Sequence, residues 1–201
     1  DDLSRGLGDV YKRQIITCSI SGFGDTELNR PAYDNLIQGY AGAMSITGTD
    51  KENPVKSGIP IADLGAGLYA VIGILSAIQS REKNDSGEHV DISMLDTQVS
   101  LLTYMATMHF LSGENPEPIG NQHMNHVPFN SYRTSDGFIQ IGVVAEDFWP
   151  SLIEALDLRQ LDTEENKVRI GRLKNRENID EALQEVFITN TTEHWLKILQ
   201  E

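Results

Sequence analysis

The stretch of sequence that decides the fold is Gly58-Ile-Pro-Ile-Ala-Asp63-Leu-Gly-Ala-Gly-Leu-Tyr-Ala-Val-Ile-Gly-Ile-Leu-Ser-Ala-Ile78. Its apolar part, residues 64–78, is shorter than the roughly 18 residues that a membrane span requires, and Gly73 interrupts it. We therefore expect a buried helix of a globular domain, with a carboxylate at its start.

Asp63, at that start, has two interpretations. An aspartate ahead of a helix is commonly its N-cap, because the side chain accepts a hydrogen bond from an unpaired backbone N–H of the first turn. The alternative is a carboxylate nucleophile, which a substrate can approach closely because Gly65 and Gly67 carry no side chains. Position alone favours the cap, so the surrounding sequence has to decide between the two.

The segments around this helix alternate between strand and helix patterns. Residues 15–20 and 89–93 are predicted to be short strands, and residues 34–44 and 95–111 are predicted to be helices. This alternation predicts an α/β domain with a Rossmann-like parallel sheet.

The composition changes after this domain, where two prolines and two glycines fall within residues 112–120. We interpret residues 15–111 as part of a large α/β domain, residues 112–126 as a linker, and residues 127–201 as part of a smaller α+β domain. The chain therefore has the organisation of a two-domain protein.

Within the smaller domain we expect a strand over residues 138–144 and a helix over residues 148–156. Residues 162–185 are rich in charge and are interpreted as a solvated helical surface. Asn190 is predicted to cap a last helix, with Glu193 returning the hydrogen bond to the cap.

The overall charge excludes some classes of partner. A net charge of −14 and a pI near 4.7 argue against a nucleic-acid or anionic-membrane surface, which requires basic clusters. Cys18 is the only cysteine, so no intramolecular disulfide can form, and we expect it to be buried in a strand. A reducing cytoplasm fits this cysteine usage.

Residues 1–14 have a different interpretation. The segment Asp9-Val-Tyr-Lys-Arg-Gln14 corresponds to the translated end of a transposon that is used to prepare sequencing libraries. No apolar stretch follows a basic start, so the segment is not a signal peptide. We expect residues 1–14 to be a loosely packed, non-native leader.

Several separated blocks of this sequence carry a family resemblance, and they are Ser19–Gly24, Arg30–Gln38, Gly42–Gly48, Gly58–Tyr69 and His89–Asp96. Their order and spacing resemble the class III coenzyme A-transferases, the CaiB/BaiF type. That family includes formyl-CoA transferase, carnitine and dicarboxylate CoA-transferases, and α-methylacyl-CoA racemase. The resemblance runs from about Ile15 to Glu201, and it implies an internal piece of a longer chain, because the family extends beyond both ends.

The resemblance implies a role for several side chains. The aspartate at the position of Asp63 is the acyl-accepting nucleophile of the family, and Tyr33 with Asp34 matches the tyrosine–acid pair of its site. Formyl-CoA transferase has a longer glutamate at the second position. Met94 matches a methionine that borders the site, and Arg30 could neutralise a CoA phosphate or an acceptor carboxylate. Each of these residues also has an ordinary structural interpretation. Tyr33 and Asp34 can form the start of a helix, Met94 can be a core residue, and Arg30 can be an arginine that faces solvent.

The chemistry that follows is acyl transfer. Asp63 would attack an acyl-CoA, expel the CoA thiolate and form an aspartyl–acyl mixed anhydride, while backbone N–H groups near Gly65 stabilise the oxyanion. This chemistry needs acyl-CoA and carboxylic acid substrates and no tightly bound cofactor. His123 and His126 have a spacing that suggests a metal pair, but no third ligand is nearby, so we expect no metal.

The acceptor and the alternatives follow from departures from the family pattern. Residues 120–126 lack the glycine run that closes the formyl-CoA transferase site, which favours a dicarboxylate or carnitine-type acceptor. One alternative is an α-methylacyl-CoA racemase, but racemases have a histidine where this chain has Tyr33, and a phenol shuttles protons poorly at neutral pH. Another is a catalytically inactive fragment of a transferase. The resemblance also implies an interlocked homodimer of the full-length protein.

Overall fold

The computed structural model of the chain describes residues 12–26 and 31–199. These residues form two compact units that divide between Pro118 and Ile119, inside the segment where the composition changes. Arg30 and residues 1–11 of the expected leader lie outside the described residues. The described end of that leader contacts the first unit, because the Arg13 carbonyl accepts a hydrogen bond from Gly87 N–H at 2.6 Å.

The first unit is a mixed α/β structure. Strand β1 pairs with β2 in parallel, with Thr17 opposite His89 and Ser21 opposite Ser93. This confirms the predicted α/β class and the parallel pairing of the two strands. The elements in chain order are β1 (Thr17–Ser21), α2 (Asp34–Tyr40), the 3-10 helix η1 (Ala43–Ile46), α3 (Ile61–Asn84), β2 (His89–Ser93), α4 (Met94–Ser100) and α5 (Tyr104–Ser112).

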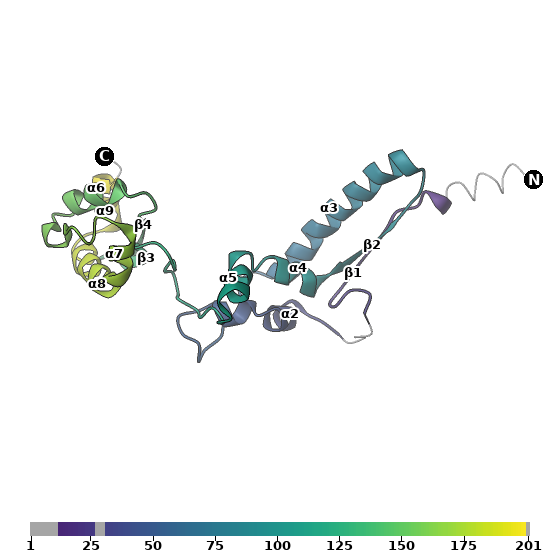
Figure 1. Cartoon of the computed structure of the whole chain (residues 1–201), viewed down its shortest axis with the longest axis horizontal. Helices are drawn as coiled ribbons and strands as arrows, with labels where there is room; N and C mark the ends of the chain where they lie inside the picture. Colours follow the sequence, from purple (N-terminus) through teal and green to yellow (C-terminus); the bar gives the residue numbers. More distant parts are fainter. Residues whose placement is uncertain (1–11, 27–30, 200–201) are drawn as a thin grey trace, which may run out of the picture. The chain divides into compact units, whose positions relative to one another are not determined.

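Helix α3 is the long element of this unit and runs along β1 and β2 (Figure 1). Its buried face consists of small residues at helical spacing, which allow a close approach to the strands. A Cβ added at Gly73 would lie only 2.5 Å from Val90 Cγ1 of β2. The buried residues are Ala62, Gly65, Ala66, Ala70 and Ala77.

The other face of α3 corrects a sequence expectation. We expected a buried helix, but large aliphatic side chains face outward, and Leu68 and Leu75 are 67% and 60% exposed. Cys18 of β1 is also exposed, where a buried cysteine was expected. The physical reason is the same for both, since the described residues pair only two strands here and cover only part of the helix surface.

By length and composition alone, α3 could cross a membrane. Its most apolar window has a mean hydropathy of 1.9, and 28% of that window is buried. The helix is longer than the apolar segment 64–78, because it begins at Ile61 and continues to Asn84. The core helix of a soluble protein passes the same test, so this finding is weak evidence for a membrane span.

A small apolar cluster joins the start of α3 to its neighbours. It consists of Phe23, Ile37, Ala62, Ala66 and Met94, which come from a loop and three helices. Ile37, Ala62 and Ala66 are fully buried. This cluster fixes where α3 begins relative to α2 and α4.

The helix predicted over residues 95–111 is two helices. Ser93 caps α4 by accepting a hydrogen bond from Asp96 N–H at 3.0 Å, and α4 ends at Ser100. Thr103 has a φ of 49°, which is a rare conformation for a β-branched residue and interrupts the helical path before Tyr104.

The second unit packs helices around an antiparallel pair of strands, in which Phe129 lies opposite Gly142. The strand Phe129–Arg133 was not predicted. The elements are β3 (Phe129–Arg133), β4 (Phe138–Gly142), α6 (Phe148–Ala155), the 3-10 helix η2 (Arg159–Leu161), α7 (Arg169–Lys174), α8 (Arg176–Phe187) and α9 (Thr192–Leu199).

Two expectations in this unit were wrong. Segment 162–185 is not only a solvated surface, because Ile179 and Leu183 are fully buried in the core beside Trp149. The last helix is capped by Thr191, whose hydroxyl accepts a hydrogen bond from His194 N–H at 3.2 Å, and not by Asn190. The charge-rich segment is therefore amphipathic.

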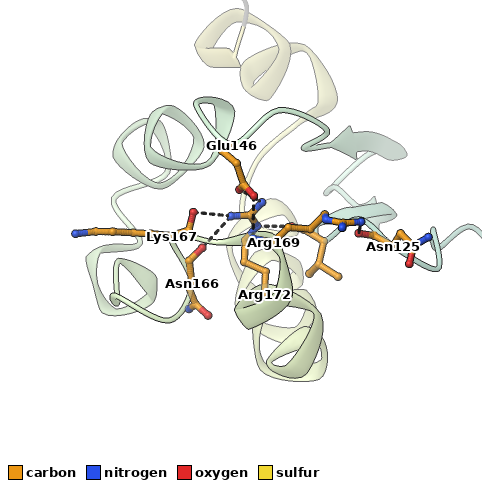
Figure 2. Close-up of polar contacts among 7 residues, drawn as sticks. Asn125, Glu146, Asn166, Lys167, Arg169 and Arg172 are labelled. Carbon is orange, nitrogen blue, oxygen red and sulfur yellow. Dashed lines mark hydrogen bonds and ion pairs between the residues drawn. The ribbon is translucent and has the colours of Figure 1, made fainter.

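Arg172 is a buried charged residue of this unit, with 1% of its surface exposed. Its guanidinium donates to the carbonyl oxygens of Val127 at 2.8 Å and Asn166 at 2.9 Å. It also pairs with Glu146 at 2.7 Å (Figure 2). The hydrogen bond from Arg172 lowers the pKa of the Glu146 carboxyl group below its usual value of 4.5.

Candidate active site

Asp63 lies in the first turn of α3 and is exposed. It is not the N-cap, because Pro60 occupies that position and the helix begins at Ile61. Within residues 12–26 and 31–199, the Asp63 carboxyl group has no hydrogen-bond or ion-pair partner. The capping interpretation is therefore wrong, and the carboxyl group is free to meet a ligand.

The backbone N–H groups of this first turn are nearly all occupied. Ile61 N–H donates to Ile59 O at 2.8 Å, and Leu64 N–H donates to Pro60 O at 3.0 Å. Ala62 N–H donates to a side chain of α2 at 2.9 Å. Among the described residues, the N–H of Asp63 itself has no acceptor. One donor and one carboxyl group of the same residue are thus available at the positive end of a 24-residue helix.

Asp34 supplies the acceptor for Ala62. Its Oδ1 accepts the Ala62 N–H, and its Oδ2 accepts a hydrogen bond from Gln38 Nε2 at 2.7 Å. Asp34 is also the acidic residue in the first turn of its own helix α2, which agrees with the interpretation of Tyr33 and Asp34 as a helix start. The structure therefore places Asp34 of α2 against Ala62, the residue before Asp63. There its carboxylate accepts a hydrogen bond from a first-turn N–H of α3.

Tyr33 is the residue immediately before α2, where it occupies the N-cap position. Its side chain is 69% exposed. The backbone thus places Tyr33 beside Asp34, and the convergence of its ring on Asp63 stays a prediction. Arg30 lies outside the described residues, so its role is also still a prediction.

Met94 and Gly65 lie beneath this surface. Met94 is 8% exposed and belongs to the apolar cluster with Ala62, so in this structure it is a core residue below the start of α3. A Cβ at Gly65 would lie 3.0 Å from Thr97 Cγ2 of α4. The missing side chain of Gly65 therefore serves helix packing, and the free N–H near the carboxyl group is that of Asp63.

His123 and His126 lie in the second unit, with ring centroids 4.8 Å apart. No group of three or more metal-ligating side chains occurs in the described part of the chain. Burial, followed by the charges of His126 and Arg176, lowers the pKa of His123. His123 Nδ1 accepts a hydrogen bond from Asn125 N–H at 3.0 Å, so the ring contributes to the loop before β3.

The family model described as CoA-transferase family III matches residues 10–201 of this chain. The chain belongs to CoA-transferase family III. This confirms the resemblance found from the separated sequence blocks. The match begins at residue 10, so residues 10–14 of the expected leader fall inside it.

Two similar proteins are named as CoA-transferases. Succinyl-CoA:glutarate CoA-transferase of Homo sapiens is 31% identical to this chain over an alignment of 202 residues. The alignment covers 97% of this chain and 46% of that protein. Succinyl-CoA:mesaconate CoA-transferase of Haloarcula hispanica is 31% identical over 196 residues, which cover 94% of this chain and 49% of that protein. The chain spans about half the length of the curated relatives it matches.

A solved structure agrees with this assignment. A CaiB/BaiF family protein from Brucella suis has a TM-score of 0.82 and 31% sequence identity, and the alignment covers 96% of this chain and 55% of that protein. The described fold, including α3, is thus a fold of CoA-transferase family III.

Sequence reasoning missed one residue of this site, Gln38. It is buried in α2 with 1% exposure, and it contacts both Asp34 and the backbone of Ser57. The available signal was the spacing of Asp34 and Gln38, because residues four apart lie on the same face of a helix. Nothing in the sequence showed which backbone amide that face meets.

Proposed function

We propose that the whole protein transfers coenzyme A between an acyl-CoA and a carboxylic acid, with a dicarboxylic acid as the acceptor and Asp63 as the nucleophile. The relatives described above are named for glutarate and mesaconate, which are dicarboxylic acids. The single observation that carries the role of Asp63 is its exposed carboxyl group, which is unpaired among the described residues. It stands at a helix N-terminus.

The reaction begins at the thioester. A carboxylate oxygen of Asp63 bonds to the acyl carbonyl carbon, the carbon–sulfur bond breaks, and the CoA thiolate leaves with the electron pair. The product is an aspartyl–acyl mixed anhydride. The thiolate then attacks the aspartyl carbonyl, which releases the donor acid and leaves an Asp63–CoA thioester.

The second half repeats these steps with the acceptor. Its carboxylate attacks the Asp63–CoA thioester, forms a new anhydride and expels the thiolate. The thiolate attacks the acceptor carbonyl of that anhydride, which yields the new acyl-CoA and restores the Asp63 carboxylate. No proton or electron is consumed in the complete cycle.

The start of α3 supports this chemistry electrostatically. Each tetrahedral intermediate carries a negative oxygen, and the unoccupied Asp63 N–H is a donor beside the reacting carboxyl group. The helix dipole adds partial positive charge at the same place, which stabilises the oxyanion. No described observation favours racemisation over transfer.

Further properties of the whole protein belong to the same proposal. It would bind acyl-CoA and carboxylic acid substrates without a tightly bound cofactor, assemble as a homodimer and act in the cytoplasm. The net charge of −14 supports a protein that binds neither nucleic acid nor an anionic membrane. The large aliphatic side chains of α3 support a protein surface as its covering partner.

The test is chemical trapping on the product of the full-length reading frame. Hydroxylamine added with succinyl-CoA converts an Asp63 anhydride or thioester into a hydroxamate, which peptide mass spectrometry locates. A panel of dicarboxylic acids and carnitine then ranks the acceptors. We expect an Asp63 hydroxamate and turnover with dicarboxylic acids; turnover without any modification of Asp63 would contradict the covalent route.

A further inference from the structure

Gln38 is a buried polar residue whose side chain connects two points of the candidate active site. It lies on α2 with 1% of its surface exposed, one turn after Asp34. Its Oε1 accepts a hydrogen bond from Ser57 N–H at 2.8 Å, and its Nε2 donates to Asp34 Oδ2 at 2.7 Å. Asp34 Oδ1 in turn accepts the Ala62 N–H at 2.9 Å.

These bonds hold both ends of one segment. Residues 57–62 lead directly into the first turn of α3, and the Asp34–Gln38 clamp, as we name this pair, contacts the first and last of them. The order of donors is fixed, because the Ser57 N–H requires an acceptor and therefore turns the amide nitrogen of Gln38 towards Asp34.

The segment between the clamped ends has little other support. A Cβ at Gly58 would meet no atom within 4 Å, and Ile59 is 57% exposed. Pro60 has no N–H to donate and is also exposed. The path of the chain into α3 therefore depends mainly on the clamp, which binds both ends of the segment, and on the burial of Ala62.

The clamp decides which backbone donor of the first turn remains available. It occupies the N–H of Ala62 and leaves the N–H of Asp63 without an acceptor among the described residues. A shift of this turn by a fraction of an ångström would move the Asp63 carboxyl group and its N–H together. Small errors in the placement of a reacting group cost large factors in rate.

We propose that Gln38 is a positioning residue for Asp63 that acts through Asp34, and that Asp34 serves as a hydrogen-bond acceptor for α3 and not as a group that contacts the substrate. This inference rests on the proposed function, because it assigns a purpose to the geometry around the nucleophile.

The structure offers an exchange that separates positioning from direct contact. Gln38→Glu keeps the acceptor for Ser57 but places two carboxyl groups against each other. Asp34→Asn keeps the acceptor for Ala62 but places two amide groups against each other. The double variant Asp34→Asn/Gln38→Glu restores all three hydrogen bonds. Donor and acceptor are reversed only in the bond between the two side chains, and the carboxylate is removed from position 34.

We expect each single variant of the full-length protein to lower kcat by about ten- to a hundredfold, with a smaller change in KM for the acyl-CoA. The double variant should return to within about threefold of the wild-type kcat. Gln38→Met, which removes both bonds without adding a charge, should resemble the single variants. The matched control is Gln184→Glu, because Gln184 forms hydrogen bonds to the backbone of Arg133 in the second unit. We expect this control to leave kcat unchanged.

Amide hydrogen exchange provides a readout that does not require activity. The Ala62 amide should exchange faster in Gln38→Glu and Gln38→Met than in the wild type, and it should recover in the double variant. An Ala62 amide that is insensitive to Gln38 overturns the clamp, whether or not Asp63 is acylated.

The kinetic outcomes are equally decisive. If the double variant is as slow as Asp34→Asn, the carboxylate of Asp34 acts on the substrate itself and the inference is wrong. Single variants with wild-type kcat would also overturn it. Absence of an Asp63 hydroxamate in the wild type is a separate result, because it contradicts the proposed function. In that case the hydrogen exchange of the Ala62 amide still tests the clamp.

Discussion

Replacement of Asp63 by asparagine separates the chemical role of this side chain from its structural role. The carboxyl group is exposed and unpaired among the described residues, so its only expected contribution to stability is the interaction of a first-turn acid with the helix dipole. That interaction is worth about 0.3–1 kcal/mol. At about 2–4 °C per kcal/mol for a domain of this size, the thermal midpoint should fall by about 1–4 °C.

Activity should respond on a different scale. An amide cannot form the anhydride, so Asp63→Asn should lower kcat for CoA transfer by at least about a thousandfold. Calorimetry of the full-length protein gives the midpoint, and chromatography of the acyl-CoA products gives the rate. Glu177→Gln, an exposed acid-to-amide change in the first turn of α8, is the control that should share the small stability loss and retain activity.

Two results would refute this reasoning. Transfer at the wild-type rate by folded Asp63→Asn protein, with mass spectrometry excluding deamidation to aspartate, would show that Asp63 is not the nucleophile. A fall in the midpoint of more than about 10 °C would show that the side chain has structural partners, because the helix dipole alone cannot account for it.

Two further predictions concern acid stability and helix packing. The lowered pKa of Glu146 means that the folded protein releases this proton more readily than the unfolded chain, so its contribution to stability is present above the usual pKa of 4.5 and is lost as the pH falls through the folded value. Glu146→Gln should therefore lose less stability than the wild type when urea unfolding is measured at falling pH, and an identical acid response of both proteins would contradict this. In α3, Gly67→Ala should raise the free energy of unfolding by up to about 1 kcal/mol, because a Cβ there meets no atom within 4 Å and alanine favours the helix. Gly73→Ala should lower it by about 1–2 kcal/mol, because the added methyl group lies 2.5 Å from a methyl group of Val90; equal effects of the two changes in urea denaturation would refute the packing argument.

Local patterns predicted much of the first unit. The strand His89–Ser93 was predicted with its observed bounds, because its alternation is a local property that its parallel pairing preserves. The helix that follows Pro60 was also expected, although it begins two residues before Asp63. That offset matters chemically, because it excludes the capping interpretation of Asp63 and makes it an exposed first-turn residue.

Properties that depend on distant neighbours were not accessible from the sequence. The outward face of α3 is as apolar as its inward face, so composition alone gave no indication that Leu68 would be exposed. Gln38 and Arg172 are polar residues that would ordinarily be assigned to the surface. Each is buried because backbone groups far along the chain, at Ser57 and at Val127, supply its hydrogen-bond partners.

The small inward face of α3 also limits how this sequence can change over time. Ala62, Ala66 and Ala77 are at most 2% exposed, and Gly73 has no space for even one methyl group. A single mutation at these positions nearly always enlarges the side chain, so almost every available step collides with the neighbouring packing. We therefore expect this stripe of α3 to diverge far more slowly among descendants of this gene than the aliphatic residues on its opposite side, where leucine, isoleucine and valine can replace one another.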